Sequence, residues 1–174
     1  MALISAKTII ISISLFHITL GFFFLTSPIT VADQALVWLL GEATGMPYSR
    51  SFDAPSAALS FLAVILASLG ISDLVTLNLP EEVCLIHYWG TQAPLRLVIS
   101  VLLVFYSFFF SGSSPLPRHL PPAAGDGLQN RVFFTFMFVE LISWLWIVVT
   151  LREERAQVLA RKATRRRSYQ AHAT

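Results

Sequence analysis

Charged residues and cysteine are both scarce in this 174-residue chain, and each scarcity excludes a class of protein. Charged side chains make up 13% of the sequence, about half the share that is usual in a soluble domain. Hydrophobic residues make up 55%, and the mean hydropathy is +0.68. A soluble fold of this size leaves too much of its surface wet to hide so many apolar side chains. The single cysteine, Cys84, excludes an intramolecular disulfide and a metal site built on paired cysteines.

Signatures of catalysis and of metal binding are also missing from the sequence. It contains no G-x-S-x-G nucleophile elbow and no glycine-rich loop that would cradle a phosphate. The histidines stand in separate segments, without the short spacing that zinc ligands have; they are His17, His87, His119 and His172. We therefore expect a protein that is not an enzyme and that holds no metal and no cofactor.

Long apolar runs are what the sequence has in abundance. They cover residues 8–26, 57–79, 95–111 and 132–151, and the third, at about 17 residues, is only just long enough to cross a bilayer. The runs are continuous and do not alternate with period two, which favours helices over barrel strands. The predicted fold class is all-α: a polytopic membrane helical bundle of about four transmembrane helices in one domain, residues 1–151.

Two shorter segments between the runs are predicted to lie at the membrane interface. Pro28 ends the first run, and residues 29–43 then mix apolar with acidic side chains, a pattern typical of an interfacial or re-entrant helix. Residues 81–92 form a short amphipathic link, whose Trp89 is of the type that favours the headgroup level. One or two interfacial helices therefore accompany the predicted spans.

Positive charge is concentrated at the end of the chain. Residues 152–174 hold seven of the twelve Lys and Arg residues and two of the ten Asp and Glu residues, so this tail carries +5 and the rest of the chain −3. The asymmetry favours an orientation signal over a nucleic-acid-binding domain, and we expect no direct contact with nucleic acid. Four spans put both ends on one side of the membrane, and the basic tail predicts that this side is the cytosol.

Three consecutive arginines in the tail, Arg165, Arg166 and Arg167, are a further candidate site. They would bind anionic lipid headgroups or act as an arginine-type retention signal. The simpler interpretation, which we favour, is a positive-inside anchor.

Ionisable residues within the apolar runs are the candidate functional positions, because a charged side chain is costly inside a bilayer. His17 lies near the middle of the first run and Glu140 near the middle of the fourth. Their similar depth leads to the hypothesis that the two side chains meet. Such a contact would serve either as a proton or ion relay or, as we favour, as a hydrogen bond that holds two helices together.

Asp73 and Arg96 are the second candidate pair. Asp73 stands near the end of the second run and Arg96 opens the third, so the connecting loop brings both to one side of the membrane. An ion pair would lower the cost of both charges, and Arg96 alone could instead extend toward the headgroups. Arg96 also shares a helical face with Ser100, Ser107 and Ser111. That stripe would line a polar path or, as small hydroxyl residues more often do, allow close packing of helices.

Small residues mark an expected packing surface on the second run. There Ala63, Ala67 and Gly70 form one face, which predicts helix packing and no chemistry. On the first run, His17 shares its face with Ser14 and Gly21, because steps of three and four residues stay on one side of a helix.

Short motifs follow one another through the chain in a fixed order. They are ISAKTI at 4–9, ADQ at 32–34, LGEA at 40–43, LGISDLV at 69–75, LPEE at 79–82, YWG at 88–90 and QAPLR at 92–96. In this order they resemble the fungal protein family named for increased loss of mitochondrial DNA. The resemblance covers most of the chain through the fourth run and leaves out the tail after Arg152.

The resemblance implies a small multi-span protein of a fungal intracellular membrane, in the endoplasmic reticulum or, as the alternative, in a mitochondrial membrane. It links the chain to mitochondrial genome maintenance and implies no catalytic residues. Our leading hypothesis is a non-enzymatic scaffold or complex subunit in the lipid bilayer, with another membrane protein or a second copy as its partner. The alternatives are an ion channel or transporter with a polar path, and a membrane lipid-modifying enzyme.

Overall fold

The computed structural model describes residues 4–80, 82–110 and 126–172, and within these ranges the chain is helical and contains no strand. The elements are α1 (Ala6–Thr26), α2 (Pro28–Ala32), α3 (Ala35–Thr44), η1 (Arg50–Phe52), α4 (Ala57–Thr76), η2 (Val83–Tyr88), α5 (Trp89–Phe109), η3 (Asp126–Leu128) and α6 (Arg131–His172).

The predicted all-α membrane bundle is confirmed in these parts of the chain. Four helical stretches are long and apolar enough to cross a bilayer: Ala6–Thr26, Ala57–Thr76, Val83–Phe109 and Arg131–Thr164. Large apolar side chains cover their outer faces, with Phe22 60% exposed, Phe61 69% and Leu102 63%. Such exposure suits a surface in contact with lipid.

Polar side chains cap the starts of three of these helices. The Ser5 hydroxyl accepts from the Thr8 amide at 3.2 Å, and the Ser56 hydroxyl accepts from the Leu59 amide at 3.2 Å. The Asn130 side-chain oxygen accepts from the Phe133 amide at 2.9 Å. Each cap satisfies an amide that has no partner within its own helix, which fixes where the helix begins.

The segment predicted to lie at the interface, residues 29–43, forms two short helices, α2 and α3. Pro28 begins α2, where its missing amide hydrogen costs nothing. Gly45 ends α3 in the left-handed conformation, with φ of 68°, which glycine adopts without steric penalty. The α3 helix packs against the beginning of α6.

The third span begins earlier than the sequence indicates. Residues 81–92 were predicted to be an amphipathic link, but η2 is a π-helix that runs directly into α5. Gly90 and Pro94 are helix-breaking signals in soluble proteins, yet both lie inside this continuous helix. Membrane helices tolerate such residues because neighbouring groups compensate for the lost backbone hydrogen bond.

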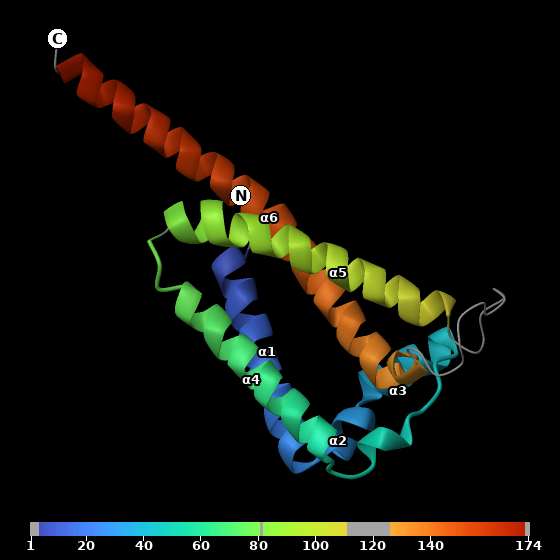
Figure 1. Cartoon of the computed structure of the whole chain (residues 1–174). Helices are drawn as coiled ribbons and strands as arrows, with labels where there is room; N and C mark the ends of the chain where they lie inside the picture. The colour runs from blue at the N-terminus through green and yellow to red at the C-terminus, as the bar shows by residue number, and fades with distance from the viewer. Residues whose placement is uncertain (1–3, 81, 111–125, 173–174) are drawn as a thin grey trace.

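The helix α6 continues beyond the span, to His172, and so includes most of the basic tail. No proline or glycine occurs between Arg131 and His172 to stop it. At 1.5 Å per residue it is about 63 Å long, roughly twice the thickness of the hydrocarbon core. Figure 1 shows its last third projecting away from the bundle, at the end where α1 begins.

The long helices pack as two pairs. Helix α1 lies against α4, and α5 lies against α6, while α1 also touches α6 (Figure 1). In the first pair a Cβ added to Gly70 would lie 2.5 Å from the Ser14 carbonyl oxygen, and one added to Gly21 would lie 2.8 Å from the Ala63 carbonyl oxygen. The predicted small-residue face of α4, together with Gly21 of α1, therefore brings the backbones of the two helices together.

Two apolar clusters fill the interior at the two ends of α1. One gathers Ile10 with Trp89, Trp144 and Ile147 at the end where α1 starts. The other gathers Leu20 and Phe24 with residues of α2, α3 and α4 at the opposite end. The ionisable residues lie beside the first cluster, between the two helix pairs.

Candidate functional site

His17 and Glu140 meet inside the bundle, as the sequence led us to hypothesise. The ring Nε2 of His17 on α1 lies 2.6 Å from Oε1 of Glu140 on α6. The exposed fractions of the two residues are 1% and 6%. A contact of this length is a hydrogen bond, in which one proton lies between the two atoms. The pair is neutral overall whether the proton sits on the imidazole or on the carboxyl, which lowers the cost of placing it in a bilayer.

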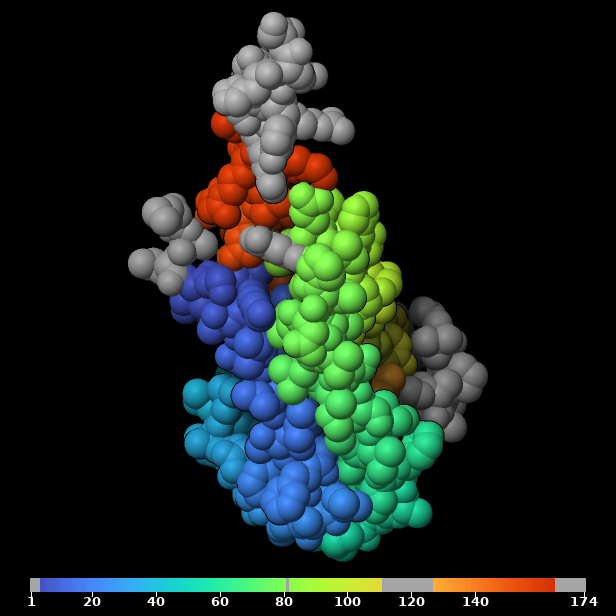
Figure 2. Space-filling model, turned by 90° about the vertical axis from the view of Figure 1, so that its left-hand side faces the viewer, coloured from blue at the N-terminus to red at the C-terminus, as the bar shows by residue number. Residues whose placement is uncertain are grey.

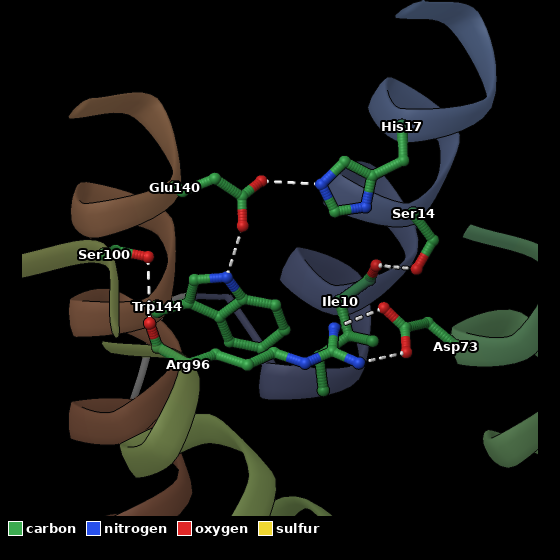
Figure 3. A network of polar contacts seen from close by, with 8 residues as sticks. All are labelled: Ile10, Ser14, His17, Asp73, Arg96, Ser100, Glu140 and Trp144. Carbon is green, nitrogen blue, oxygen red and sulfur yellow. Dashed lines mark hydrogen bonds and ion pairs between the residues drawn. The ribbon is translucent and has the colours of Figure 1, made fainter. Parts of the chain in front are cut away.

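The second oxygen of Glu140 is also engaged. Trp144, one turn later on α6, donates from its indole Nε1 to Glu140 Oε2 at 2.6 Å (Figure 3). Residues four apart on a helix lie on the same face, so this contact follows from the sequence spacing. Both carboxyl oxygens of Glu140 therefore have a partner.

Asp73 and Arg96 form a bidentate ion pair between α4 and α5. The Nη1 of Arg96 lies 2.5 Å from Asp73 Oδ2, and Nη2 lies 2.8 Å from Oδ1. The side chain of Asp73 is 1% exposed and that of Arg96 is 18% exposed. Two parallel charge-assisted hydrogen bonds of this kind are stronger than hydrogen bonds between neutral groups and fix the orientation of both side chains. Arg96 thus points into the bundle and does not extend toward the headgroups.

Two tryptophans join the pairs into one network. The guanidinium carbon of Arg96 lies 4.9 Å from the centroid of the Trp144 ring and 5.5 Å from that of Trp89. The two indole rings stack with centroids 5.8 Å apart. Trp144 therefore donates to Glu140 with its edge and contacts Arg96 with its face, which is favourable because the aromatic face is electron-rich.

The burial of Trp89 was not predicted. Its residue type favours the headgroup level, and in the structure it is 0% exposed and packs in the apolar cluster beside Trp144. The sequence offered a signal for Trp144, its spacing of four from Glu140, but none for Trp89.

The packing of α1 on α4 positions His17. A Cβ at Gly70 would lie 3.3 Å from the Cβ of His17, so the absence of a side chain at Gly70 lets α4 approach directly behind the histidine. The Nδ1 of His17 is buried and has no hydrogen-bond partner within the described structure. Within the network, the indole Nε1 of Trp89 is likewise buried without a hydrogen-bond partner in the described structure.

The serine stripe of the third span faces the interior. Ser100 and Ser107 are buried, and their hydroxyls donate to the carbonyls of Arg96 and Leu128, at 2.8 and 3.0 Å. Hydroxyls that are committed to backbone carbonyls fit helix packing better than a water-filled path. Ser111 lies outside the described residues.

The remaining candidates lie elsewhere. Residues 165–167 belong to α6, far from the network, and the structure does not describe the side chains of these arginines. Across the described part of the chain, no group of three His, Cys, Asp or Glu side chains is arranged to hold a metal ion.

Comparison with models of protein families gives a match. The model of the family described as increased loss of mitochondrial DNA protein 1 matches residues 4–161. Comparison with curated proteins and with solved structures gives no match. The matched region contains the first three long apolar helices, most of the fourth, and both buried pairs. The chain therefore belongs to the family of increased loss of mitochondrial DNA protein 1.

Proposed function

We propose that the protein is a non-enzymatic scaffold or complex subunit of an intracellular membrane, and that it supports mitochondrial DNA maintenance indirectly. The observation that carries the proposal is the pairing of the intramembrane ionisable groups. Both oxygens of Asp73 and both oxygens of Glu140 are engaged by side chains of other residues. A carboxylate that is fully engaged in this way braces helices and is not free to act as a base or to coordinate an ion.

The membrane and the orientation are part of the same proposal. We place the chain in the endoplasmic reticulum membrane of a fungus, with both ends in the cytosol. The support for this orientation is the basic extension of α6, which leaves the bundle at the end where α1 begins (Figure 1). A protein held there reaches mitochondrial DNA only through other components, such as lipid supply, ions or contacts between organelles.

The test asks whether the Glu140 carboxyl only holds helices together by hydrogen bonds or is needed for its charge or its proton. Glutamine at position 140 keeps both hydrogen bonds, because its oxygen accepts from Trp144 and its amide donates to His17 Nε2. In cells that lack the chain, we expect Glu140→Gln to restore mitochondrial DNA retention to near the wild-type level. Glu140→Ala leaves Trp144 and His17 without their partner and is the matched control, for which we expect lower protein abundance and lower retention.

A Glu140→Gln protein of normal abundance that fails to retain mitochondrial DNA would contradict the proposal, because the carboxyl would then be needed for its charge or its proton.

The partner is tested separately, by isolating the tagged chain together with its native lipid. We expect a second membrane protein, or a second copy of the chain, in stoichiometric amount. Isolation of the chain as a monomer with no other protein bound would overturn the subunit part of the proposal.

One observation favours an ion or proton pathway as the second candidate function. His17 Nδ1 is buried without a partner within the described residues, and a histidine with one bonded and one unbonded nitrogen can pass a proton between them. Ion and proton flux into liposomes that contain the purified chain tests this candidate. Flux that Glu140→Gln abolishes in a folded protein would support it and would count against the scaffold.

A further inference from the structure

A cavity of about 490 Å³ opens at the end of the bundle where α1 begins. It is lined by the start of α1, the turn after α4, η2 and the α6 extension. Figure 2 shows these segments converging on one face, with α1 in blue, the α4–α5 connection in green and α6 in red. It shares no residue with the His17–Glu140 and Asp73–Arg96 pairs, so it is a separate feature from the network above.

The cavity lies where the apolar spans give way to charged residues. Leu77 follows the last residue of α4, and Lys7 is the second residue of α1. On α6 the cavity begins at Glu154, just after the apolar stretch that ends with Leu151. Three different helices thus change from apolar to polar sequence at its wall, which places it at the depth of the lipid headgroups.

The wall of the cavity combines apolar and cationic side chains. Leu77, Leu79 and Leu85 supply apolar surface, and Lys7 and Arg161 supply two cations. Neither cation forms an ion pair within the described structure. By contrast, Lys162, the next residue on α6, is paired with Glu82 at 2.7 Å and does not line the cavity.

Glu154 is the carboxylate in the wall, and it has a structural partner. Its Oε1 accepts from the Ala6 amide at 2.9 Å, at the amino terminus of α1, where a negative charge is favoured. The wall therefore presents two cations and one carboxylate, one oxygen of which accepts from Ala6, so its net charge is positive. That balance favours a negatively charged ligand that also has an apolar part.

We propose that this cavity binds one membrane phospholipid, with its phosphate between Lys7 and Arg161 and the beginning of its acyl chains against the leucines. Lysine and arginine are the side chains that bind phosphate most strongly, through charge-assisted hydrogen bonds. A cavity with an apolar wall binds a defined number of lipid molecules. The general attraction of a basic tail to an anionic membrane surface has no such fixed number. Anionic headgroups bind more tightly than zwitterionic ones, since the charge of the wall is net positive.

The experiment is native mass spectrometry of the full chain in detergent, titrated separately with phosphatidylserine and phosphatidylcholine. We expect one phosphatidylserine per chain, bound more tightly than phosphatidylcholine. The double variant Lys7→Gln/Arg161→Gln is expected to weaken phosphatidylserine binding at least tenfold. The matched control is Arg152→Gln/Lys162→Gln, which removes the same charge from the same end of the molecule outside the cavity and is expected to change binding less than twofold.

A second variant tests the cavity without changing charge. Leu79→Trp, at a position 41% exposed, places a larger side chain at the cavity wall and is expected to reduce lipid binding while the helical signal and the melting temperature stay near the wild-type values. Equal weakening by both double variants would overturn the proposal, because binding would then follow charge alone. Displacement of the lipid by millimolar inorganic phosphate would overturn it too, because the site would then be one for a soluble anion.

Discussion

Two of the helix interfaces in this bundle are built from opposite kinds of side chain. At its closest points the α1–α4 contact is made by small residues, with Gly70 against the Ser14 carbonyl and Gly21 against the Ala63 carbonyl. The contact between this helix pair and the α5–α6 pair contains the ionisable side chains, His17 with Glu140 and Asp73 with Arg96. Small residues thus hold the helices within the first pair, and buried charges link the two pairs.

The difference follows from the solvent. Lipid is as apolar as the leucines on the helix surface, so apolar burial alone gives helices in a bilayer little reason to associate. Close backbone approach gains dispersion contacts wherever glycine permits it. Where larger side chains keep helices apart, a hydrogen-bonded charge pair is the interaction that lipid cannot replace, because an unpaired charge in lipid is costly. The buried charges are therefore understood as the contact that fixes how one pair sits on the other.

Removing one member of the ion pair is expected to have the largest effect. Arg96→Met leaves the carboxylate of Asp73 buried without a partner, which costs about 3–5 kcal/mol in comparable buried pairs. We expect a loss of that order in the free energy of unfolding, measured by denaturant titration in detergent micelles. The double variant Asp73→Leu/Arg96→Met removes both charges and should recover much of the loss; no recovery would show that the ion pair is not the source of the effect.

Adding a methyl group to the α1–α4 contact is expected to have the next largest effect. A Cβ at Gly70 meets a backbone oxygen at 2.5 Å, which cannot move without shifting the helix. We expect Gly70→Ala to lower the free energy of unfolding by roughly 1–3 kcal/mol, as overpacking does. Gly127→Ala is the matched control, because nothing lies within 4 Å of its added Cβ. Equal stability of the two variants would contradict the tight contact.

A double-mutant cycle on His17 and Glu140 measures the second polar link. We expect the double change His17→Ala/Glu140→Ala to cost less than the sum of the single changes, with a coupling of about 1–2 kcal/mol, which is within the range for residues in contact. Stability in micelles or in bilayer discs provides the measurement. Strict additivity of the two changes would show that the 2.6 Å contact contributes nothing to stability.

The smallest expected effect concerns an ion pair outside the membrane, Glu82 with Lys162. The hydrogen bond from Lys162, and then its charge, hold the pKa of Glu82 below the ordinary value for glutamate. The stabilisation is therefore complete above that ordinary value and is lost as the pH falls through the lowered pKa. Because both side chains are exposed, solvent screens the pair and little change in stability is expected. An NMR titration should show the Glu82 pKa rising in Lys162→Gln; an unchanged pKa would rule out the contact.

The sequence predicted the spans and both polar pairs because these depend on depth along the helices. His17 and Glu140 lie at similar depth on antiparallel helices, and Asp73 and Arg96 flank one connection, so linear position was sufficient. The start of the third helix was missed, because Gly90 and Pro94 stop helices in water but are tolerated in a membrane protein. The boundary drawn at Leu151 rested on hydropathy, which does not register that the charged tail remains a good helix former.

Which helices pair could not be predicted from hydropathy. Apolar runs indicate that helices cross the membrane but not which of them are neighbours. The small-residue face of α4 indicated packing without identifying the partner helix. The burial of Trp89 was missed for a similar reason. Its position near the end of a span suggested contact with headgroups, and only the arrangement of the helices shows that Trp144 covers it.

The most direct test of the central claim, that buried charges link the two helix pairs, is a distance measurement. Spin labels at Leu15 and Ile71 report on the α1–α4 pair, and labels at Ile71 and Val98 report on the contact between pairs, in a chain with Cys84→Ala; all three labelled positions are more than half exposed. On Arg96→Met we predict an unchanged Leu15–Ile71 distance and a longer, broader Ile71–Val98 distribution. An unchanged Ile71–Val98 distance in a folded Arg96→Met protein would contradict the claim.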